Sequence, residues 1–124
     1  MNGLKVLYVD DEEDIREIAA LALEVDPEIE VRTVPSGAAA LKTAAEWRPD
    51  VILLDVMMPS MDGPTTLAHL RDSDSTRNIP VVFITARAQT REIQDLKARG
   101  ALDVMTKPFD PMELAFSVRR VLAR

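Results

Sequence analysis

Short apolar runs alternate along the chain with longer segments in which apolar residues recur every three or four positions. The runs are rich in valine, isoleucine and leucine, which is typical of β-strands. They predict strands at Leu4–Val9, Ile29–Val34, Val51–Leu54, Ile79–Ile84 and Asp103–Thr106. The first and third runs are apolar at nearly every position, so they suit a parallel sheet that is buried on both faces.

The segments between the runs have the apolar spacing of amphipathic helices. Helices are predicted at Glu12–Val25, Gly37–Trp47, Pro64–Asp72 and Thr90–Arg99, with a last helix from about Asp110-Pro111 through Leu122. Ser36 is predicted to cap the second helix, and Gly100 to end the fourth. At the start of the last helix, Asp110 is a predicted cap and Pro111 suits the first turn.

Strands and helices therefore alternate from end to end, which predicts an α/β protein of (βα)5 type. Because strand–helix–strand crossovers are right-handed, the helices cover both faces of a doubly wound, five-stranded parallel sheet. No linker, repeat or low-complexity stretch divides the chain, so residues 1–124 are expected to form one domain.

Composition narrows the class of protein. Hydrophobic residues make up 47% of the 124 residues and charged residues 29%, as in globular domains. Fifteen basic and 21 acidic residues give a net charge of -6, which argues against contact with nucleic acid. The chain has no cysteine, no apolar run near the roughly 20 residues that span a bilayer, and no signal-peptide pattern at its start. A cytoplasmic location without a membrane partner is expected.

Polar side chains follow the predicted strands where each one ends. Asp10 and Asp11 follow the first strand and Asp55 the third, while Thr85 and Lys107 follow the fourth and fifth. The carboxyl ends of parallel strands meet at one edge of a sheet, where ligands bind in open α/β folds. The sequence therefore brings three carboxylates, a hydroxyl and an ammonium group together there.

The three carboxylates indicate a divalent metal site. Like charges held close together persist when a cation or a proton neutralises them. Oxygen ligands without nearby histidine or cysteine suit Mg²⁺, which takes few carboxylates and keeps several waters. The competing interpretation is that Asp11 only caps the first helix.

Asp55 is the candidate nucleophile, because a carboxylate beside Mg²⁺ can attack phosphorus and form an acyl phosphate. The new phosphate needs donors, and Thr85 and Lys107 offer a hydroxyl and an ammonium group. Lys107 precedes Pro108, and an X-Pro bond that is cis would fix the direction of the lysine. Together these residues indicate phosphoryl chemistry.

With these motifs the chain resembles a receiver domain of a two-component response regulator, with the flavodoxin-like fold of the chemotaxis regulators. The resemblance covers essentially all 124 residues. It rests on the ordered motifs YVDDEED, VILLDVMMPSMDG, FITARA and TKPFDP.

The resemblance implies the strand order 2-1-3-4-5 and a phosphorelay module rather than an enzyme acting on other substrates. It implies that Asp55 accepts a phosphoryl group from a histidine kinase or a histidine phosphotransfer protein. It implies Mg²⁺ held by Asp11, Asp55 and the Met57 carbonyl, with Asp10 acting largely through water. By the same resemblance, Thr85 and Lys107 contact the phosphoryl group. 

Receivers usually carry an aromatic residue three positions before the lysine, and here that position is Val104. The readout is therefore expected to run through Thr85 and Lys107 to an effector on the face formed by the fourth helix, fifth strand and fifth helix.

Two other classes of function remain open. An aspartate-nucleophile phosphatase or phosphotransferase generally has a second acid two residues after its nucleophile, where this chain has Met57. A flavodoxin-like flavin binder would have a Ser/Thr/Gly-rich loop after the first strand, where this chain has five consecutive acidic residues, Asp10–Asp14.

Overall fold

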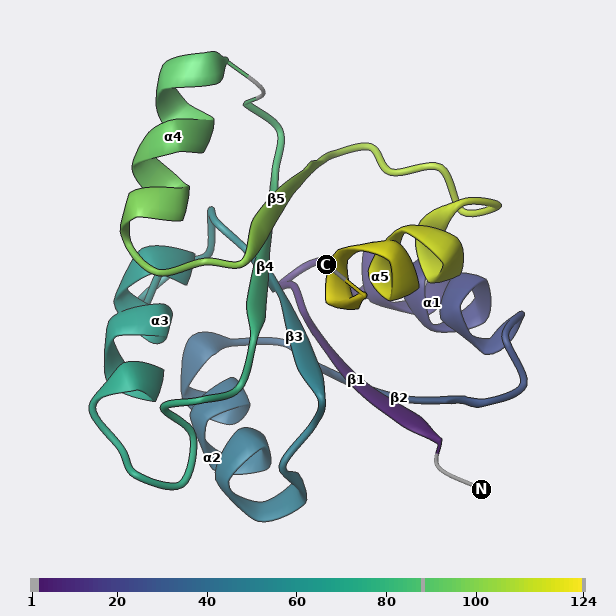
Figure 1. The fold of residues 1–124 in the computed structure, drawn as a ribbon, viewed down its shortest axis with the longest axis horizontal. Helices are drawn as coiled ribbons and strands as arrows, with labels where there is room; N and C mark the ends of the chain where they lie inside the picture. The colour runs from purple at the N-terminus through teal and green to yellow at the C-terminus, as the bar shows by residue number, and fades with distance from the viewer. Residues whose placement is uncertain (1–2, 88, 124) are drawn as a thin grey trace.

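A five-stranded parallel sheet lies at the centre of the protein, between two layers of helices (Figure 1). The computed structural model describes residues 3–87 and 89–123. The strands are β1 (Leu4–Val9), β2 (Ile29–Val34), β3 (Val51–Asp55), β4 (Val81–Thr85) and β5 (Asp103–Thr106). They lie in the order β2-β1-β3-β4-β5 and are all parallel. The doubly wound fold and its strand order are therefore confirmed.

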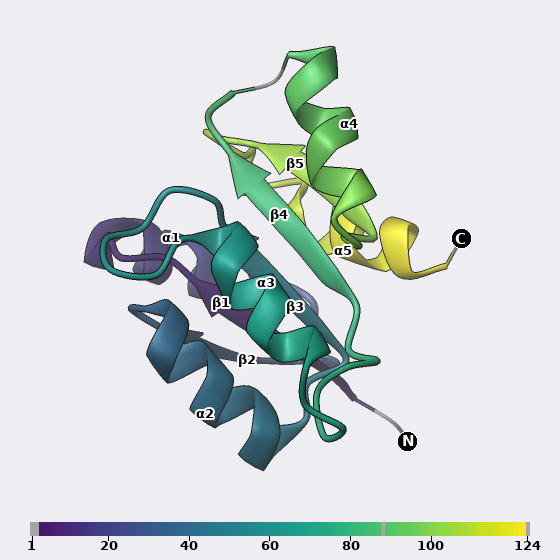
Figure 2. The same cartoon turned by 90° about the vertical axis from the view of Figure 1, so that its left-hand side faces the viewer.

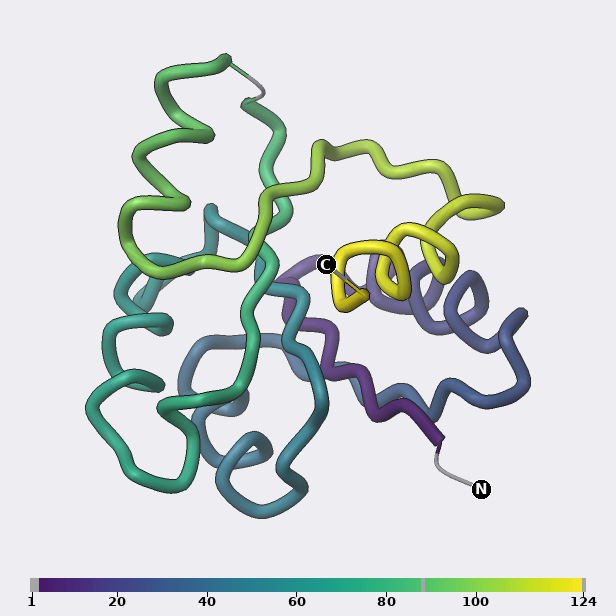
Figure 3. The backbone as a smooth tube through the Cα atoms, in the orientation of Figure 1, coloured from purple at the N-terminus to yellow at the C-terminus, as the bar shows by residue number. Residues whose placement is uncertain are grey.

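The helices are α1 (Glu13–Glu24), α2 (Gly37–Trp47), α3 (Gly63–Arg71), α4 (Thr90–Ala98) and α5 (Leu114–Leu122). One face of the sheet is covered by α2, α3 and α4, which Figure 2 turns toward the viewer, and the other by α1 and α5. The Cα trace in Figure 3 shows α1 to α4 each connecting one strand to the next, and α5 following the last strand. None of the helices in the described part of the chain has the length and apolar character needed to cross a membrane.

The sheet is buried on both faces, and this burial determines the register in which the strands pair. Leu7 and Val9 of β1 pack against the layer of α2, α3 and α4, whereas Val6 and Tyr8 pack against α1 and α5. All four side chains are 0% exposed. A slip of one residue would bring each side chain into the helix layer that is shaped for its neighbour, and mispacking of this kind typically costs about 1–3 kcal/mol. The polar residues at the strand ends are therefore held in one register.

Two predicted helix ends are confirmed. The Ser36 hydroxyl accepts a hydrogen bond of 3.1 Å from the Ala39 amide at the start of α2. After α4, Gly100 has a φ of 107°, a left-handed conformation that favours glycine. Its amide donates to the Lys97 carbonyl at 3.0 Å, which satisfies one of the last carbonyls of the helix.

The prediction that α5 begins near Asp110-Pro111 is wrong. The Asp110 carboxylate accepts from the Met112 amide at 2.9 Å, and its carbonyl accepts from the Glu113 amide at 2.9 Å. These bonds close a separate turn, and α5 starts only at Leu114. Aspartate and proline therefore form a turn here that precedes the helix instead of opening it.

Strands β3 and β4 end one residue later than predicted, so Asp55 and Thr85 are their last residues. Strand β4 also begins at Val81 and not at Ile79, because the Ile79 amide donates to the Thr76 carbonyl at 3.1 Å in the preceding turn. Asp55 and Thr85 therefore lie on the sheet rather than in the loops that follow it.

The loop after Asp55 folds back tightly onto the end of β3. Asp62 caps α3 by accepting a 2.9 Å hydrogen bond from the Thr65 amide, a cap that the sequence analysis missed. A Cβ atom on Gly63 would lie 2.6 Å from the Asp55 carbonyl oxygen and 2.9 Å from the Val56 Cα. Only glycine allows this approach without a shift of the backbone that carries Asp55.

Trp47 lies at the other end of the sheet. Its ring is 8% exposed and has the Arg32 guanidinium 4.5 Å and the Lys5 ammonium 5.6 Å from its centroid. The Lys5 ammonium also donates to the Trp47 carbonyl at 3.4 Å. Both cations are on the sheet, so these contacts join the end of α2 to β1 and β2.

Candidate functional site at the carboxyl edge of the sheet

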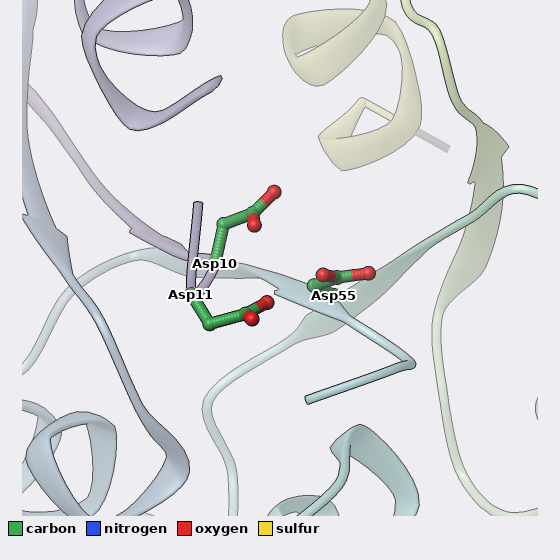
Figure 4. Close-up of side chains that lie close together, drawn as sticks. All are labelled: Asp10, Asp11 and Asp55. Carbon is green, nitrogen blue, oxygen red and sulfur yellow. The ribbon is translucent and has the colours of Figure 1, made fainter. Parts of the chain in front are cut away.

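Three carboxylates meet where β1 and β3 end. Asp10 and Asp11 follow β1 directly, and Asp55 is the last residue of β3, so strand pairing brings them together (Figure 4). Each offers an oxygen atom, and these three atoms all lie within 4.8 Å of one another. Asp10 is 0% and Asp55 5% exposed, whereas Asp11 is exposed. Two of the three negative charges are thus largely removed from water.

The Asp10 carboxylate is the most extensively hydrogen-bonded of the three. Its Oδ1 accepts from the Glu12 amide at 3.0 Å. Its Oδ2 accepts from the Tyr8 hydroxyl at 3.2 Å and from the Lys107 ammonium at 2.9 Å. A carboxylate offers about four acceptor positions, so protein donors take up most of them.

Lys107 is the cation of the site, and three carboxylates share it. Its Nζ lies 2.9 Å from Asp10, 3.3 Å from Glu12 and 3.4 Å from Asp55. Burial alone would lower the pKa of Lys107, but the hydrogen bond to Asp10 and the charges of Asp55 and Asp10 outweigh it and hold the pKa above its usual range. Lys107 therefore stays protonated. The peptide bond between Lys107 and Pro108 is cis.

The pKa of Asp55 is raised from 3.8 to about 6. Burial is the main cause and the Asp10 charge adds to it, while Lys107 and the Met57 amide oppose the rise. The single lysine thus does not compensate for the crowding of negative charge around Asp55. A bound divalent cation would add a second opposite charge and lower this pKa.

Thr85 and Met57 lie beside the cluster. Thr85 is 4% exposed, and its Oγ1 accepts from the Arg87 amide at 3.1 Å. Its carbonyl accepts from the Lys107 amide at 2.8 Å, so the ends of β4 and β5 are tied together. Thr85 and Met57 also line a hollow of about 510 Å³ between α3 and α4, and Met57 is 68% exposed.

The alternative interpretation of Asp11, as a helix cap, is wrong. The N-cap of α1 is Glu12, and no side chain caps its amides. Across residues 3–87 and 89–123, no hydrogen bond or ion pair to the Asp11 carboxylate is present. Its oxygens are therefore open to a ligand from solvent.

Tyr8 and Glu12 contact the site, and the sequence analysis missed both. Tyr8 could have been found, because side chains two apart in a strand lie on the same face and Tyr8 therefore points the same way as Asp10. Glu12 gave no such signal, because its contact with Lys107 depends on the direction of an exposed side chain and not on the position of a strand end.

The donor set fits a magnesium ion. It consists of carboxylate oxygens, which are hard ligands, with no histidine or cysteine among the grouped residues. The crowded charge of the cluster would be relieved by a cation, as the raised pKa of Asp55 shows. The fold and the site together define a flavodoxin-like α/β domain with an acidic cluster at the carboxyl edge of its sheet.

Comparisons with known proteins give the family. A family model, the response regulator receiver domain, matches residues 6–119. The transcriptional regulatory protein CseB of Streptomyces coelicolor is 40% identical over 119 residues, which are 96% of this chain and 49% of CseB. The response regulator PleD of Caulobacter vibrioides is 47% identical over 118 residues, which are 93% of this chain and 25% of PleD.

Among solved structures, the chemotaxis response regulator CheY4 of Vibrio cholerae superposes with a TM-score of 0.88 and 35% identity, over 97% of this chain and 99% of that one. The chain belongs to the response regulator receiver domain family, and it is a receiver domain of the two-component type. It spans about half the length of CseB and a quarter of that of PleD.

Proposed function

We propose that Asp55 accepts a phosphoryl group from a phosphohistidine on a histidine kinase or a histidine phosphotransfer protein, in a Mg²⁺-dependent reaction. The observation that carries this proposal is the convergence of the buried Asp55 carboxylate with Asp10, Asp11 and Lys107 at one edge of the sheet. With three carboxylates and only one ammonium group, the site has a net negative charge until a metal ion is present.

Asp11, Asp55 and the Met57 carbonyl would hold the magnesium ion, with Asp10 acting largely through water. The hydrogen bonds of Asp10 support this division, because protein donors already occupy both of its oxygens. Asp11 is exposed and has no such partners in the described part of the chain. Bound Mg²⁺ supplies positive charge that neutralises the attacking carboxylate and the phosphoryl oxygens.

In the transfer step an Asp55 oxygen attacks phosphorus, and the bond from phosphorus to the donor imidazole nitrogen breaks. Its electron pair returns to the imidazole, and the product is an acyl phosphate on Asp55. Lys107, 3.4 Å from Asp55 and held protonated, would contact the phosphoryl oxygens as a point charge. Thr85 would donate its hydroxyl from the neighbouring strand.

The domain would catalyse only its own phosphorylation and dephosphorylation. An aspartate-nucleophile phosphatase is not favoured, because Met57 stands where its second acid would be and the chain belongs to a family of signalling domains. Residues 1–124 would act as one receiver domain in the cytoplasm, where kinases carry phosphohistidine. The names of CseB and PleD denote regulators, and an effector partner is proposed on that basis.

Incubation with acetyl phosphate and Mg²⁺ tests the proposal. The intact mass should rise by one phosphoryl group, and hydroxylamine should remove it, because an acyl phosphate is labile to that nucleophile. The same incubation with EDTA should leave the mass unchanged. Stable labelling with EDTA present would contradict a metal-dependent acyl phosphate.

The proposed output surface is the face formed by α4, β5 and α5. Val104 is half-buried on β5 and packs against the core on the α4 side. Because valine has no ring, no aromatic side chain can move between the core and the surface at this position. The remaining connection is the bond between the Lys107 amide and the Thr85 carbonyl, at the ends of β5 and β4. A force on either residue would therefore shift both strands. If the phosphoryl group contacts Thr85 and Lys107 more favourably in one conformation of this face than in the other, phosphorylation shifts the equilibrium toward that conformation. The net charge of -6 gives the chain as a whole no general attraction for nucleic acid.

Amide hydrogen exchange tests this output. Beryllofluoride, a phosphoryl mimic, should slow exchange several-fold in Gln89–Glu92 at the start of α4 and in β5, because these segments follow Thr85 and precede Lys107. Thr85→Ala should remove most of that protection. Thr33→Ala makes the same change on the opposite edge strand β2 and should leave it intact. Equal protection in both variants would mean that the change does not pass through Thr85.

A further inference from the structure

The hydroxyl of Tyr8 reaches the site from inside the core. Tyr8 is the only tyrosine of the chain, and its side chain is 0% exposed within the cluster formed with α1 and α5. Its hydroxyl donates to Asp10 Oδ2 at 3.2 Å, and Asp10 is also 0% exposed. A buried carboxylate needs such donors, because an unpaired buried charge is costly.

Asp10 Oδ2 depends on two donors, and only one of them is fixed. The first is the Tyr8 hydroxyl, and the second is the Lys107 ammonium at 2.9 Å. Lys107 also contacts Asp55 and Glu12, and it sits on a flexible four-carbon stem. A phosphoryl group on Asp55 would add negative charge beside Lys107 and attract the ammonium away from Asp10.

We propose that Tyr8 is a positioning residue that holds the Asp10 carboxylate in place while Lys107 moves from Asp10 to the phosphoryl group on Asp55. This inference rests on the proposed phosphorylation of Asp55. With Tyr8 present, Oδ2 keeps a hydrogen bond after the lysine leaves. Without the Tyr8 hydroxyl, the departure of Lys107 leaves a buried oxygen without a protein donor, and the free energy of the phosphorylated state is higher.

The surroundings of Tyr8 keep its hydroxyl from following the lysine. Tyr8 is the next-to-last residue of β1, in a strand with neighbours on both sides, and it is paired with Thr33 of β2 and Leu53 of β3. The Phe109 ring packs edge-on against the Tyr8 ring, with centroids 6.1 Å apart and planes at 70°. The ring is therefore clamped by the core, and phenylalanine at this position keeps that packing and removes only the donor.

Tyr8→Phe tests the proposal through two affinities, those for Mg²⁺ and for beryllofluoride at saturating Mg²⁺, both measured by titration calorimetry. The affinity for beryllofluoride should fall about tenfold, the effect of one hydrogen bond to a charged acceptor. The affinity for Mg²⁺ should stay equal or rise, because the charge of the acidic cluster is unchanged and Asp10 loses a donor that competes for its oxygen. A general loosening of the site would weaken both affinities and would overturn the proposal.

Phe109→Leu is the matched control, because it loosens the ring contact and keeps the hydroxyl. It should change both affinities less than twofold, and a tenfold loss for beryllofluoride in this variant would assign the effect to packing and overturn the proposal. Failure of the proposed function is distinguishable, because the native protein would then bind no beryllofluoride at all.

A second measurement needs no substitution in the fold. Because Tyr8 is the only tyrosine, growth on 3-fluorotyrosine labels this position alone. Its ¹⁹F resonance should shift when beryllofluoride is added with Mg²⁺ present, since Asp10 Oδ2 then keeps only the Tyr8 hydroxyl of its two protein donors. An unchanged resonance, with beryllofluoride shown to be bound, would overturn the proposal.

Discussion

Replacing Asp55 by asparagine is expected to abolish phosphorylation and, at the same time, to stabilise the metal-free protein at neutral pH. The amide lacks a nucleophilic carboxylate oxygen, so labelling by acetyl phosphate should fall by at least about a thousandfold. The gain in stability follows from the pKa of Asp55, which the fold raises from 3.8 to about 6 because the group is buried and close to Asp10. Loss of activity and gain of stability thus share one physical cause.

The sign and the pH window follow from that pKa. Between pH 3.8 and about 6 the folded state binds more protons at Asp55 than the unfolded state does. The free energy of unfolding therefore falls as the pH rises through this window. The difference corresponds to about 3 kcal/mol above pH 6, or roughly 10–15 °C in Tm for a domain of this size. The native protein and Asp55→Asn should melt together near pH 4 and separate by that amount at pH 7.5.

Thermal melts in EDTA across this pH range provide the measurement. Asp74→Asn is the control, because it removes a carboxylate that is 93% exposed in the turn before β4. Its melting curve should follow that of the native protein at every pH. If the native protein has a higher Tm than Asp55→Asn at pH 7.5, the ionised Asp55 carboxylate does not destabilise the folded state.

Asp11→Ala is expected to weaken Mg²⁺ binding by about a hundredfold while the fold stays intact. Asp11 is exposed and takes no part in capping α1, so its removal costs the structure little. The remaining Asp10 carboxylate is held by Tyr8, Lys107 and the Glu12 amide and cannot easily replace it. Loss of a direct ligand therefore leaves a site with too few free oxygens for the ion.

Calorimetric titration with MgCl₂ measures this change, and Asp74→Ala is the control. It alters the net charge equally but lies at the opposite end of the sheet, beside Arg48 and Asp50. Its affinity for Mg²⁺ should match that of the native protein. If both variants lose affinity alike, the ion responds to overall charge and not to a site that contains Asp11.

The sequence allowed the fold to be predicted because hydrophobic pattern and sheet topology act together. Strands buried on both faces, such as β3, have unbroken apolar runs, and right-handed crossovers leave few ways to connect them. The start of α5 was harder to predict. Asp110 and Pro111 suit a turn and a helix start equally well, and only the hydrogen bonds to Met112 and Glu113 decide between them.

At the site, likewise, some contacts could be predicted from the sequence and others could not. Asp10, Asp11 and Asp55 could be brought together from sequence, because every parallel strand ends at one edge and the strand neighbours were foreseen. The partition of Lys107 among Asp10, Glu12 and Asp55 could not, because it depends on side-chain positions that differ by tenths of an ångström.

The stacked environment of Trp47 has an optical consequence. It is the only tryptophan, and it rests against Lys5 near the start of β1, roughly 16 Å along the strand from Asp10. Its emission should shift to longer wavelength when the protein unfolds and the indole enters water, yet should stay silent when Mg²⁺ or a phosphoryl mimic binds at the distant edge. The protein thus carries an intrinsic fluorophore that reports global unfolding separately from ligand binding at the acidic cluster.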